Sequence, residues 1–537
     1  MQKVKEARKR HDVSKTTEIQ TKLFSDPAKK WSKEKIGDLV FNYIIQEMRP
    51  LITCEKPAFQ QLILGLTGLT SADSVLLPDR NYISKKLNTS YTNYISMLTS
   101  LLIKQQYICT TADIWSTNNK SYLGMTCHFI EEISYTHHSY VLGCRRIKGG
   151  HNYLNIAEVI NEITHTFQII NSKITHTITD IYPLLSEESN EHSEGISICL
   201  PDHMKCCAHT LNLIATTDIA KITDRSYLQI SKGTFEKLFK FWNLVSRSTA
   251  ASDTVSDKCN SKKILFYKEK LIPVFEELKL NKLKTTEWLF LKEYCEVMEP
   301  LASALDKLQG EKRSYLGYVA PTILSIRLFL LNSTNRRGYC KPLSLCIIQN
   351  LEKRFDYLFN LSSSKSKAFI LASISHPKFK MNWVPVRYKN VCRNLFIDEC
   401  NTLSAIINSS PNSGSSSEEN DESDDDKFYN NLLENSSPEN CIDDNTNESQ
   451  CSNERRNTNL SGIQSSSFLN SKKKDLTMLD SFHIVKNVFL KYNTTLPSSA
   501  PVERLFSGAI QVLTPRRNCL KDTTFEKLLC CRCSVAK

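Results

Sequence analysis

Side chains that could bind or transform a ligand concentrate in three short stretches of this sequence. Cys206 and His209 lie three residues apart on one face of a predicted helix, a spacing that permits a site but is equally common in packed cores. Glu503 lies in the first turn of a predicted amphipathic helix, where a solvated carboxylate fits the pattern equally well. Cys530 and Cys533 form a Cys-x-x-Cys pair, but zinc needs about four ligands and no second pair lies nearby. Spacing alone therefore assigns no chemistry to these residues.

The C-terminal segment, residues 496–537, predicts two short amphipathic helices. After a Pro-bounded, Ser-rich turn, Val502, Leu505 and Phe506 recur at helical spacing, and a second apolar pattern follows at Phe525 and Leu528. A turn at residues 514–518, which contains Arg516 and Arg517, separates the two patterns. This arrangement favours a C-terminal docking hairpin.

Four strand-like runs follow residue 105. They cover residues 107–115, 122–130, 139–147 and 174–180, and an amphipathic helix at 156–167 precedes the last of them. Three neighbouring strands, a helix and another strand form an α/β pattern that suits a ribonuclease H-like sheet. The pattern predicts Asp113 at the end of the first strand and Asp180 at the end of the fourth.

The patterns divide the chain into five parts. Residues 216–480 are mainly helical, and a stretch rich in Ser, Asn, Asp and Glu at 408–471 is expected to be a disordered linker within them. The parts are a basic flexible arm at 1–30, a helical N-terminal region at 31–104, the first part of the α/β core at 105–215, the helical insertion at 216–480, and the second part of the core with the C-terminal segment at 481–537.

Charge and cysteine usage narrow the class of protein. The net charge is +12, and residues 418–448 hold twelve acids against one Lys, so the remaining chain carries +23. A basic fold is compatible with a polyanion such as nucleic acid, although solubility explains part of the charge. The 19 cysteines show no disulfide-scaffold pattern, and no apolar run predicts a membrane span or secretory signal. We expect a cytosolic or nuclear protein without a membrane partner.

Three blocks near the C-terminus carry a family resemblance. Ser-Ser-Ala-Pro-Val-Glu-Arg-Leu-Phe-Ser at 498–507, Leu-Thr-Pro-Arg-Arg-Asn at 513–518 and Phe-Glu-Lys-Leu-Leu at 525–529 resemble the C-terminal dimerisation segment of hAT-superfamily DNA transposases and their domesticated relatives. Order and spacing of three blocks over about thirty residues are more specific than one short motif. Thr-Thr-Ala-Asp-Ile-Trp-Ser at 110–116 and Cys-Cys-Ala-His at 206–209 are also similar to motifs of that family.

The resemblance implies a fold and a set of site residues. The fold is an α/β ribonuclease H-like catalytic core interrupted by a large all-α insertion domain. Asp113, Asp180 and Glu503 would be the acidic triad that ligates Mg²⁺ or Mn²⁺ for strand cleavage and transfer. His209 would contact the scissile phosphate, with Cys206 as its structural partner. The implied dimerisation residues are Val502, Leu505, Phe506 and Leu528.

Departures from the family pattern bear on activity. Ile181-Tyr182-Pro183 replaces the polar residues expected after the second Asp, and Lys258-Cys259-Asn260-Ser261 lacks the aromatic ring that stacks on a flipped base. Only His11 and Cys54 precede residue 100, so no zinc finger of the BED type is predicted.

We therefore expect a transposase-like protein of the nucleus that forms homodimers or higher oligomers and binds DNA, with a degenerate strand-transfer site and no small-molecule substrate. A domesticated, catalytically inactive interaction or transcription-regulating factor remains the alternative. A decaying transposon copy is a third reading that the sequence does not separate from domestication.

Overall fold

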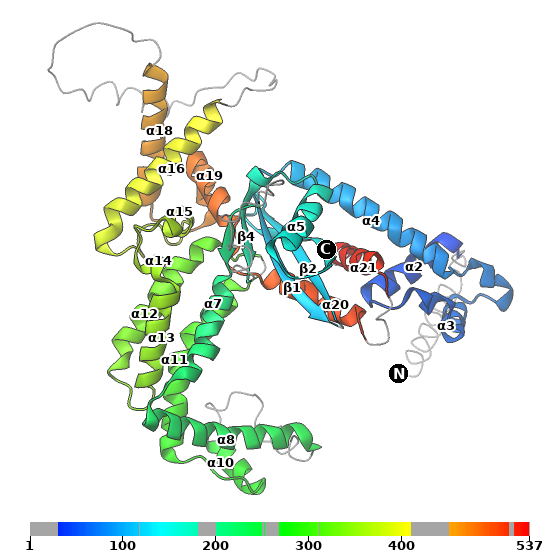
Figure 1. Cartoon of the computed structure of the whole chain (residues 1–537), viewed down its shortest axis with the longest axis horizontal. Coiled ribbons are helices and arrows are strands. Elements are labelled where there is room, and N and C mark those ends of the chain that lie inside the picture. The colour runs from blue at the N-terminus through cyan, green and yellow to red at the C-terminus, as the bar shows by residue number, and fades with distance from the viewer. Residues whose placement is uncertain are drawn as a thin grey trace, which may run out of the picture.

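The computed structural model describes residues 31–117, 119–180, 200–249, 252, 268–310, 312–409, 451–514 and 520–535. Most of these residues are helical, and one mixed five-stranded sheet lies between the N-terminal helices and a long helical region (Figure 1). The predicted basic arm at 1–30 lies outside the described residues.

The sheet has the strand order β3-β2-β1-β4-β5. Strands β1 to β3 pair antiparallel, and β4 and β5 join the other edge in parallel. The strands are β1 Ile108–Thr117, β2 Lys120–Ile130, β3 His137–Ile147, β4 Ile174–Thr179 and β5 His203–Lys205. The four predicted strands are confirmed. The fifth was not predicted because three residues are too few to show a periodic pattern.

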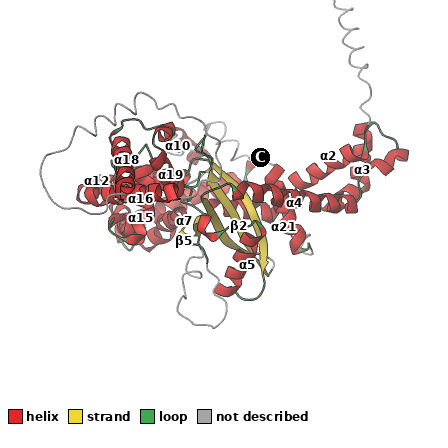
Figure 2. Ribbon diagram, turned by 90° about the horizontal axis from the view of Figure 1, so that it is seen from above, coloured by secondary structure: helices red, strands yellow, loops and turns green. Residues whose placement is uncertain are grey.

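Helices from both ends of the chain cover the sheet (Figures 1 and 2). Near the C-terminus, α20 packs on β1 and β2, while α21 packs on β3 and on the long N-terminal helix α4. One continuous apolar core joins these elements because their buried residues belong to a single cluster. The helices around the sheet are α2 Lys33–Gln46, α3 Pro57–Thr67, α4 Arg80–Ile103, α5 Tyr153–Thr166, α20 Ala500–Val512 and α21 Asp522–Val535.

The helical region lies beyond the β4 edge of the sheet and has two apolar clusters of its own. Its elements are α7 Cys207–Leu213, α8 Arg225–Arg247, α10 Lys268–Glu277, α11 Thr285–Leu308, η7 Leu316–Tyr318, α12 Val319–Thr334, α13 Lys341–Arg354, α14 Asp356–Phe359, α15 Lys367–Ser375, α16 Lys389–Ser409, α18 Cys451–Asn470 and α19 His483–Asn493. The prediction of a mainly helical stretch here is confirmed.

The predicted linker at 408–471 is too long. Helix α18 occupies Cys451–Asn470 and packs against α16, whereas residues 410–450 lie outside the description. Phe468 is fully buried, and the small Ser461 and Ser465 lie in the interface, with the Ser461 hydroxyl bonded to Asn401. A helix with few large apolar residues and a serine-lined contact face has a polar composition, which is why it resembled a linker.

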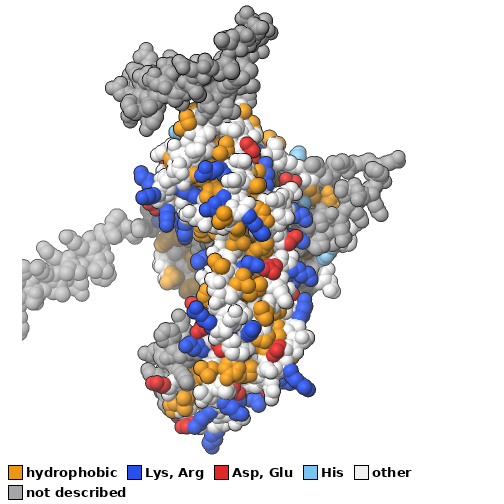
Figure 3. Space-filling model, turned by 90° about the vertical axis from the view of Figure 1, so that its left-hand side faces the viewer, with side chains coloured by type: hydrophobic (Ala, Val, Ile, Leu, Met, Phe, Trp, Pro, Cys, Tyr) orange, Lys and Arg blue, Asp and Glu red, His pale blue; other side chains and the backbone are white. Residues whose placement is uncertain are grey.

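One described segment, Leu316–Thr334, is long and apolar enough to cross a membrane by length and composition. It comprises η7 and α12, which pack against α11, α13 and α15. Packing of this kind is that of a core helix. On the face of the helical region shown in Figure 3, hydrophobic patches alternate with Lys and Arg side chains. Leu328 and Phe329 of α12 are among the exposed apolar residues of the chain.

A buried asparagine joins the sheet to the helical region. The Asn493 side-chain carbonyl accepts a hydrogen bond from the Gly317 N–H at 3.0 Å, and its amide donates to the Ala372 carbonyl at 3.0 Å. Its backbone carbonyl lies 3.0 Å from His137 Nε2 at the start of β3. Only glycine fits at position 317, because an added Cβ would lie 2.5 Å from the Ala372 carbonyl oxygen.

Replacing this asparagine should destabilise the junction. Asn493→Ala leaves a buried N–H and a buried carbonyl without their partner, which costs on the order of 2–4 kcal/mol in the free energy of unfolding. Urea unfolding monitored by far-ultraviolet circular dichroism measures the loss. Asn487→Ala, a half-buried position on the same helix, is the control and should change stability by less than about 1 kcal/mol. Equal effects of the two substitutions would contradict this account.

Candidate active site

Two aspartates on adjacent parallel strands face the same region of the sheet. Asp113 lies in the middle of β1, paired with Gly124 of β2, so its predicted place at a strand end is wrong. The strand continues because Ile114 and Trp115 extend the pairing with β2. Asp180 directly follows β4, whose residue Ile178 pairs with Thr111 of β1. Because β1 and β4 are parallel and in this register, the two carboxylates come from neighbouring positions along the sheet.

Helix α20 brings the third carboxylate, Glu503, to this region. The helix approaches β2 at Gly124, where an added Cβ would lie 2.6 Å from the Phe506 ring and 2.9 Å from Val502. Phe506 also stacks on Trp115, with ring centroids 5.9 Å apart. The cross-strand neighbour of Asp113 is therefore a residue without a side chain, and this gap lets α20 lie directly over β1 and β2.

Ser499 links two of the three carboxylates. Its Oγ lies 3.3 Å from Asp180 Oδ2 and 3.2 Å from Glu503 Oε1. A hydroxyl carries one proton, so it donates to only one carboxylate at a time and brings no positive charge. The two acids are thus held close together with a neutral group between them.

The approach to α20 is a buried stretch of chain, residues 493–500. Thr495 Oγ1 lies 2.9 Å from Thr175 Oγ1 of β4, and the Leu496 N–H lies 3.5 Å from the Cys109 sulfur of β1. The Pro497 carbonyl accepts a hydrogen bond from the Cys207 N–H at 2.9 Å. Contacts to both strands and to α7 fix the position from which α20 starts.

Cys206 and His209 belong to the same cluster. Cys206 is the N-cap of α7, where its sulfur accepts a hydrogen bond from the His209 N–H at 3.2 Å and from the Ser499 N–H at 3.3 Å. Cys206 is buried, and burial raises the pKa of its thiol to about 11, so it is a protonated capping group and not a nucleophile. His209 is exposed, and its Nδ1 lies 3.5 Å from Asp180 Oδ2.

Burial and repulsion between the carboxylates raise the pKa values of Asp113 and Asp180. Burial raises the pKa of Asp113 to about 6; the Ile114 N–H opposes this, and the charges of Asp180 and Glu503 add to it. Burial likewise raises the pKa of Asp180, with Glu503 raising it further and His209 opposing the shift. The cluster therefore has an excess of negative charge that nearby cationic groups do not balance.

The type of donor suits a hard divalent cation, because carboxylate oxygens are the ligands that Mg²⁺ and Mn²⁺ prefer. As placed, no group of three His, Cys, Asp and Glu side chains among the described residues forms a ready-made metal site. Asp180 and Glu503 would have to turn towards a common point, away from the Ser499 hydroxyl. The three carboxylates are suitable ligands for such a cation. In the structure, the hydrogen-bonded Ser499 hydroxyl separates Asp180 from Glu503.

Glu503 also faces a cavity of about 400 Å³ between α11 and α20. The cavity is lined mainly by polar and charged side chains. Its lining residues are Asp306, Gln309, Ala500, Glu503, Arg504 and Ser507.

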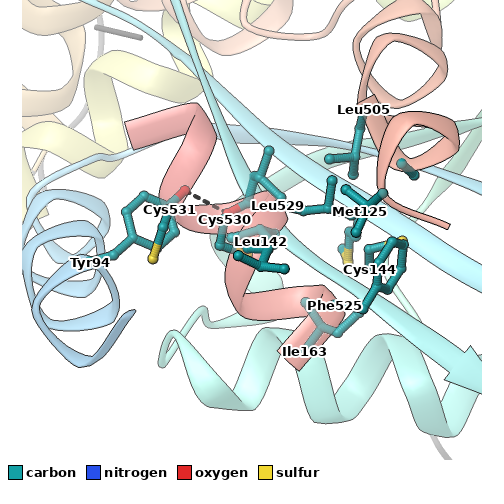
Figure 4. Close-up of a cluster of buried hydrophobic side chains, with 14 of the residues drawn as sticks. Tyr94, Met125, Leu142, Cys144, Ile163, Leu505, Phe525, Leu529, Cys530 and Cys531 are labelled. Carbon is teal, nitrogen blue, oxygen red and sulfur yellow. Dashed lines mark hydrogen bonds between the residues drawn. The ribbon is translucent and has the colours of Figure 1, made fainter. Parts of the chain in front are cut away.

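The four residues that the resemblance assigns to dimerisation are buried in the structure. Val502, Leu505, Phe506 and Leu528 are 0%, 5%, 7% and 3% exposed and belong to the core of the sheet. Figure 4 shows Leu505 of α20 and Phe525 and Leu529 of α21 among apolar side chains of the strands and α5. Their helical stripe faces the chain's own sheet, and the dimerisation role that the resemblance implies for them stays a prediction. Cys530 is buried in the same core.

Sequence reasoning missed Ser499 and Gly124. Ser499 lies within the resembling block, but only the fold shows that its hydroxyl reaches Asp180 across 319 positions of sequence. A glycine in an otherwise apolar strand is a signal of close backbone approach, and Gly124 could have been found in this way.

The chain combines a mixed five-stranded sheet with a large helical region. The acidic cluster of Asp113, Asp180 and Glu503 lies where α20 meets the sheet. Residues 472–534, which contain α19 to α21, match the family model of the hAT family C-terminal dimerisation region. On this match the C-terminal part of the chain is similar to hAT-family transposases and contains a region for self-association. A search of curated proteins found no match.

The close contact at Gly124 predicts a specific pattern of stability. Gly124→Ala should lower the free energy of unfolding by about 1–3 kcal/mol, because the new methyl group overlaps the Phe506 ring. Phe506→Leu in the same chain removes the clashing ring atoms and should recover part of the loss. A double-mutant cycle in urea measures this coupling.

Gly65→Ala is the matched control for Gly124→Ala. Gly65 lies in α3, and nothing lies within 4 Å of an added Cβ. This change should be neutral or stabilising by up to about 1 kcal/mol, since alanine is the better helix former. Additive effects of Gly124→Ala and Phe506→Leu would refute the proposed contact.

The raised pKa of Asp113 predicts pH-dependent stability in the metal-free protein. Between its ordinary value of 3.8 and about 6, the folded state binds more protons at this carboxyl than the unfolded state. Its stabilising effect is therefore complete below pH 3.8 and is lost as the pH rises through 6. Asp113→Asn should stabilise the protein by on the order of 1–3 kcal/mol at pH 8 and by almost nothing at pH 4.

Thermal unfolding in EDTA measures this effect, with Asp398→Asn, an exposed position on α16, as the control that should show no such pH dependence. An equal effect of Asp113→Asn at both pH values would rule out a raised pKa.

Proposed function

We propose that the cluster of Asp113, Asp180 and Glu503 cleaves and transfers phosphodiester strands of DNA with a divalent cation. The observation that carries the proposal is the convergence of Asp180 and Glu503 on Ser499, next to Asp113, from three distant parts of the chain. Surplus acids that repel one another are costly to a fold, and they are retained where a cation or a proton is to be bound.

The sheet supports the same proposal. Three antiparallel strands followed by two parallel ones, in the order β3-β2-β1-β4-β5, agree with the ribonuclease H-like arrangement expected from the sequence. In such a core the first acid lies on the central strand and the second follows the next parallel strand. Asp113 and Asp180 occupy these two places, and the helical region separates them in sequence from Glu503.

Each residue has a distinct part in this proposal. Asp113, Asp180 and Glu503 would hold Mg²⁺ or Mn²⁺, which when bound activates a water or hydroxyl and stabilises the departing oxygen. Ser499 holds Asp180 and Glu503 near each other, and Cys206 fixes the start of α7. His209 is exposed beside Asp180 and can donate a hydrogen bond to a phosphate oxygen of the substrate.

Two further parts of the proposal concern partners and place. DNA is the proposed substrate because the chain outside residues 418–448 carries +23. A nuclear location follows from that substrate. The departures that predicted a degenerate site, at 181–183 and 258–261, lie outside the described residues, and the described part of the acidic cluster retains all three carboxylates.

A nicking assay tests the proposal. The full-length protein should convert supercoiled plasmid to the open-circular form in Mg²⁺ or Mn²⁺ and not in EDTA. Glu503→Gln removes a proposed metal ligand. Removing a group that only orients a metal ligand lowers activity by up to roughly 100-fold, so Glu503→Gln should lower the nicking rate by more than this. Glu236→Gln, an exposed position on α8, is the matched control and should keep the parent rate. Absence of nicking by the parent in both cations, or undiminished nicking by Glu503→Gln, overturns the proposal.

A further inference from the structure

Exposed cations gather at the turn between α11 and η7, beside the cavity that contains Glu503. Lys307, Lys312 and Arg313 are all exposed, and Gln309 between them lines the cavity. Arg504 lines the same cavity from α20. We call Lys307, Lys312 and Arg313 the basic turn.

Hydrogen bonds hold the basic turn in a defined place. The Ser314 hydroxyl lies 3.3 Å from the Lys307 carbonyl and 2.9 Å from the Leu308 carbonyl, which closes the turn on the end of α11. The Lys312 carbonyl accepts a hydrogen bond from the His137 N–H of β3 at 3.0 Å. Arg504 Nη1 reaches the Gln309 carbonyl at 3.4 Å. The backbone of the turn is thereby tied to the sheet and to α20, the helix that carries Glu503.

A favourable interaction with the dipole of α11 explains the position of only one of the three cations of the basic turn. A cation in the last turn of a helix interacts favourably with the helix dipole, and Lys307 lies in the last turn of α11. Lys312 and Arg313 follow the helix and gain nothing from its dipole beyond that turn. Glu311 of the same turn lies outside the described residues, and no carboxylate within the described part of the chain forms an ion pair with any residue of the basic turn.

The cavity needs these cations if it is to admit an anion. Asp306 and Glu503 line it, and their charges alone would repel a phosphodiester strand. A rim of Lys and Arg compensates for this repulsion and attracts phosphates without reading bases. Arg504 on one side of the cavity and the basic turn on the other form such a rim.

We propose that the basic turn, together with Arg504, binds the phosphate backbone of the DNA strand that passes the cavity beside Glu503. The ligand class is a phosphodiester polyanion, held by charge and independent of sequence. This inference rests on the proposed function for the identity of the strand, but it concerns binding and does not require cleavage.

Fluorescence anisotropy with a short labelled DNA duplex of mixed sequence, in EDTA and low salt, tests the inference. Changing all three residues of the basic turn to Gln should weaken binding by about tenfold or more and make the slope of log K against log salt shallower by about 2 to 3. Lys312→Gln/Arg313→Gln, which leaves Lys307 on the helix, should give about two thirds of the change in slope.

The matched control removes two Lys and one Arg from the N-terminal region, as Lys33→Gln/Arg49→Gln/Lys85→Gln. Lys33 lies in α2, Arg49 follows that helix and Lys85 lies in α4; all three are exposed, and none of them lines the cavity. The control should bind with nearly the parent affinity, and thermal unfolding of each variant shows that it is folded.

The outcomes separate this inference from the catalytic proposal. Selective loss of binding in the basic-turn variants supports the inference even if the parent nicks no plasmid, in which case only the catalytic proposal fails. Equal loss in the control, unchanged binding in the basic-turn variants, or no measurable binding by the parent overturns the inference, whatever the nicking assay shows.

Discussion

The candidate site depends on the buried connection between α19 and α20. Residues 493–500 run beside β4 and β1 and past the start of α7, and each of these elements forms a hydrogen bond with the connection. Asn493 anchors its beginning to the helical region, and Ser499 lies between two carboxylates at its end. Because the connection is short and buried, a shift at Asn493 would be transmitted to Glu503. The helical region and the sheet therefore determine the geometry of the acids jointly.

The sequence predicted most of the fold that surrounds this connection. Strands β1 to β4 and helices α5, α20 and α21 are predicted because their apolar residues recur with the period of a strand or a helix. Asp113 was placed at a strand end because Trp115 is followed by Ser, Thr and Asn, whereas pairing with β2 carries the strand on to Thr117. Helix α18 was missed because Ser461 and Ser465 take part in its contact face.

The candidate site was predicted less completely than the fold. Asp113, Asp180, Glu503, Cys206 and His209 were named by family resemblance, and the structure brings them together, while their catalytic roles remain predictions. Ser499 and Gly124 were not found, because hydrogen bonds and close approaches between distant segments leave no local period in a sequence. The apolar stripe of α20 and α21 packs on the chain's own sheet, and its pattern alone does not tell this, because a stripe looks the same whether it faces its own sheet or a second copy. Self-association follows from the matched region, and the part of these four residues in it stays a prediction.

Close packing at Gly124 also sets the order in which the site can form. Asp113 and Asp180 belong to strands made early in synthesis, whereas α20 is made some three hundred residues later, after the whole helical region. Until α20 emerges, the apolar face around Gly124 and Trp115 has no cover, and such exposed surface favours aggregation. Once α20 docks, the same contact that covers the sheet brings Glu503 to the two aspartates. A chain cut short before residue 500 would therefore lack both Glu503 and part of its core, so the acidic cluster is incomplete in any unfinished chain.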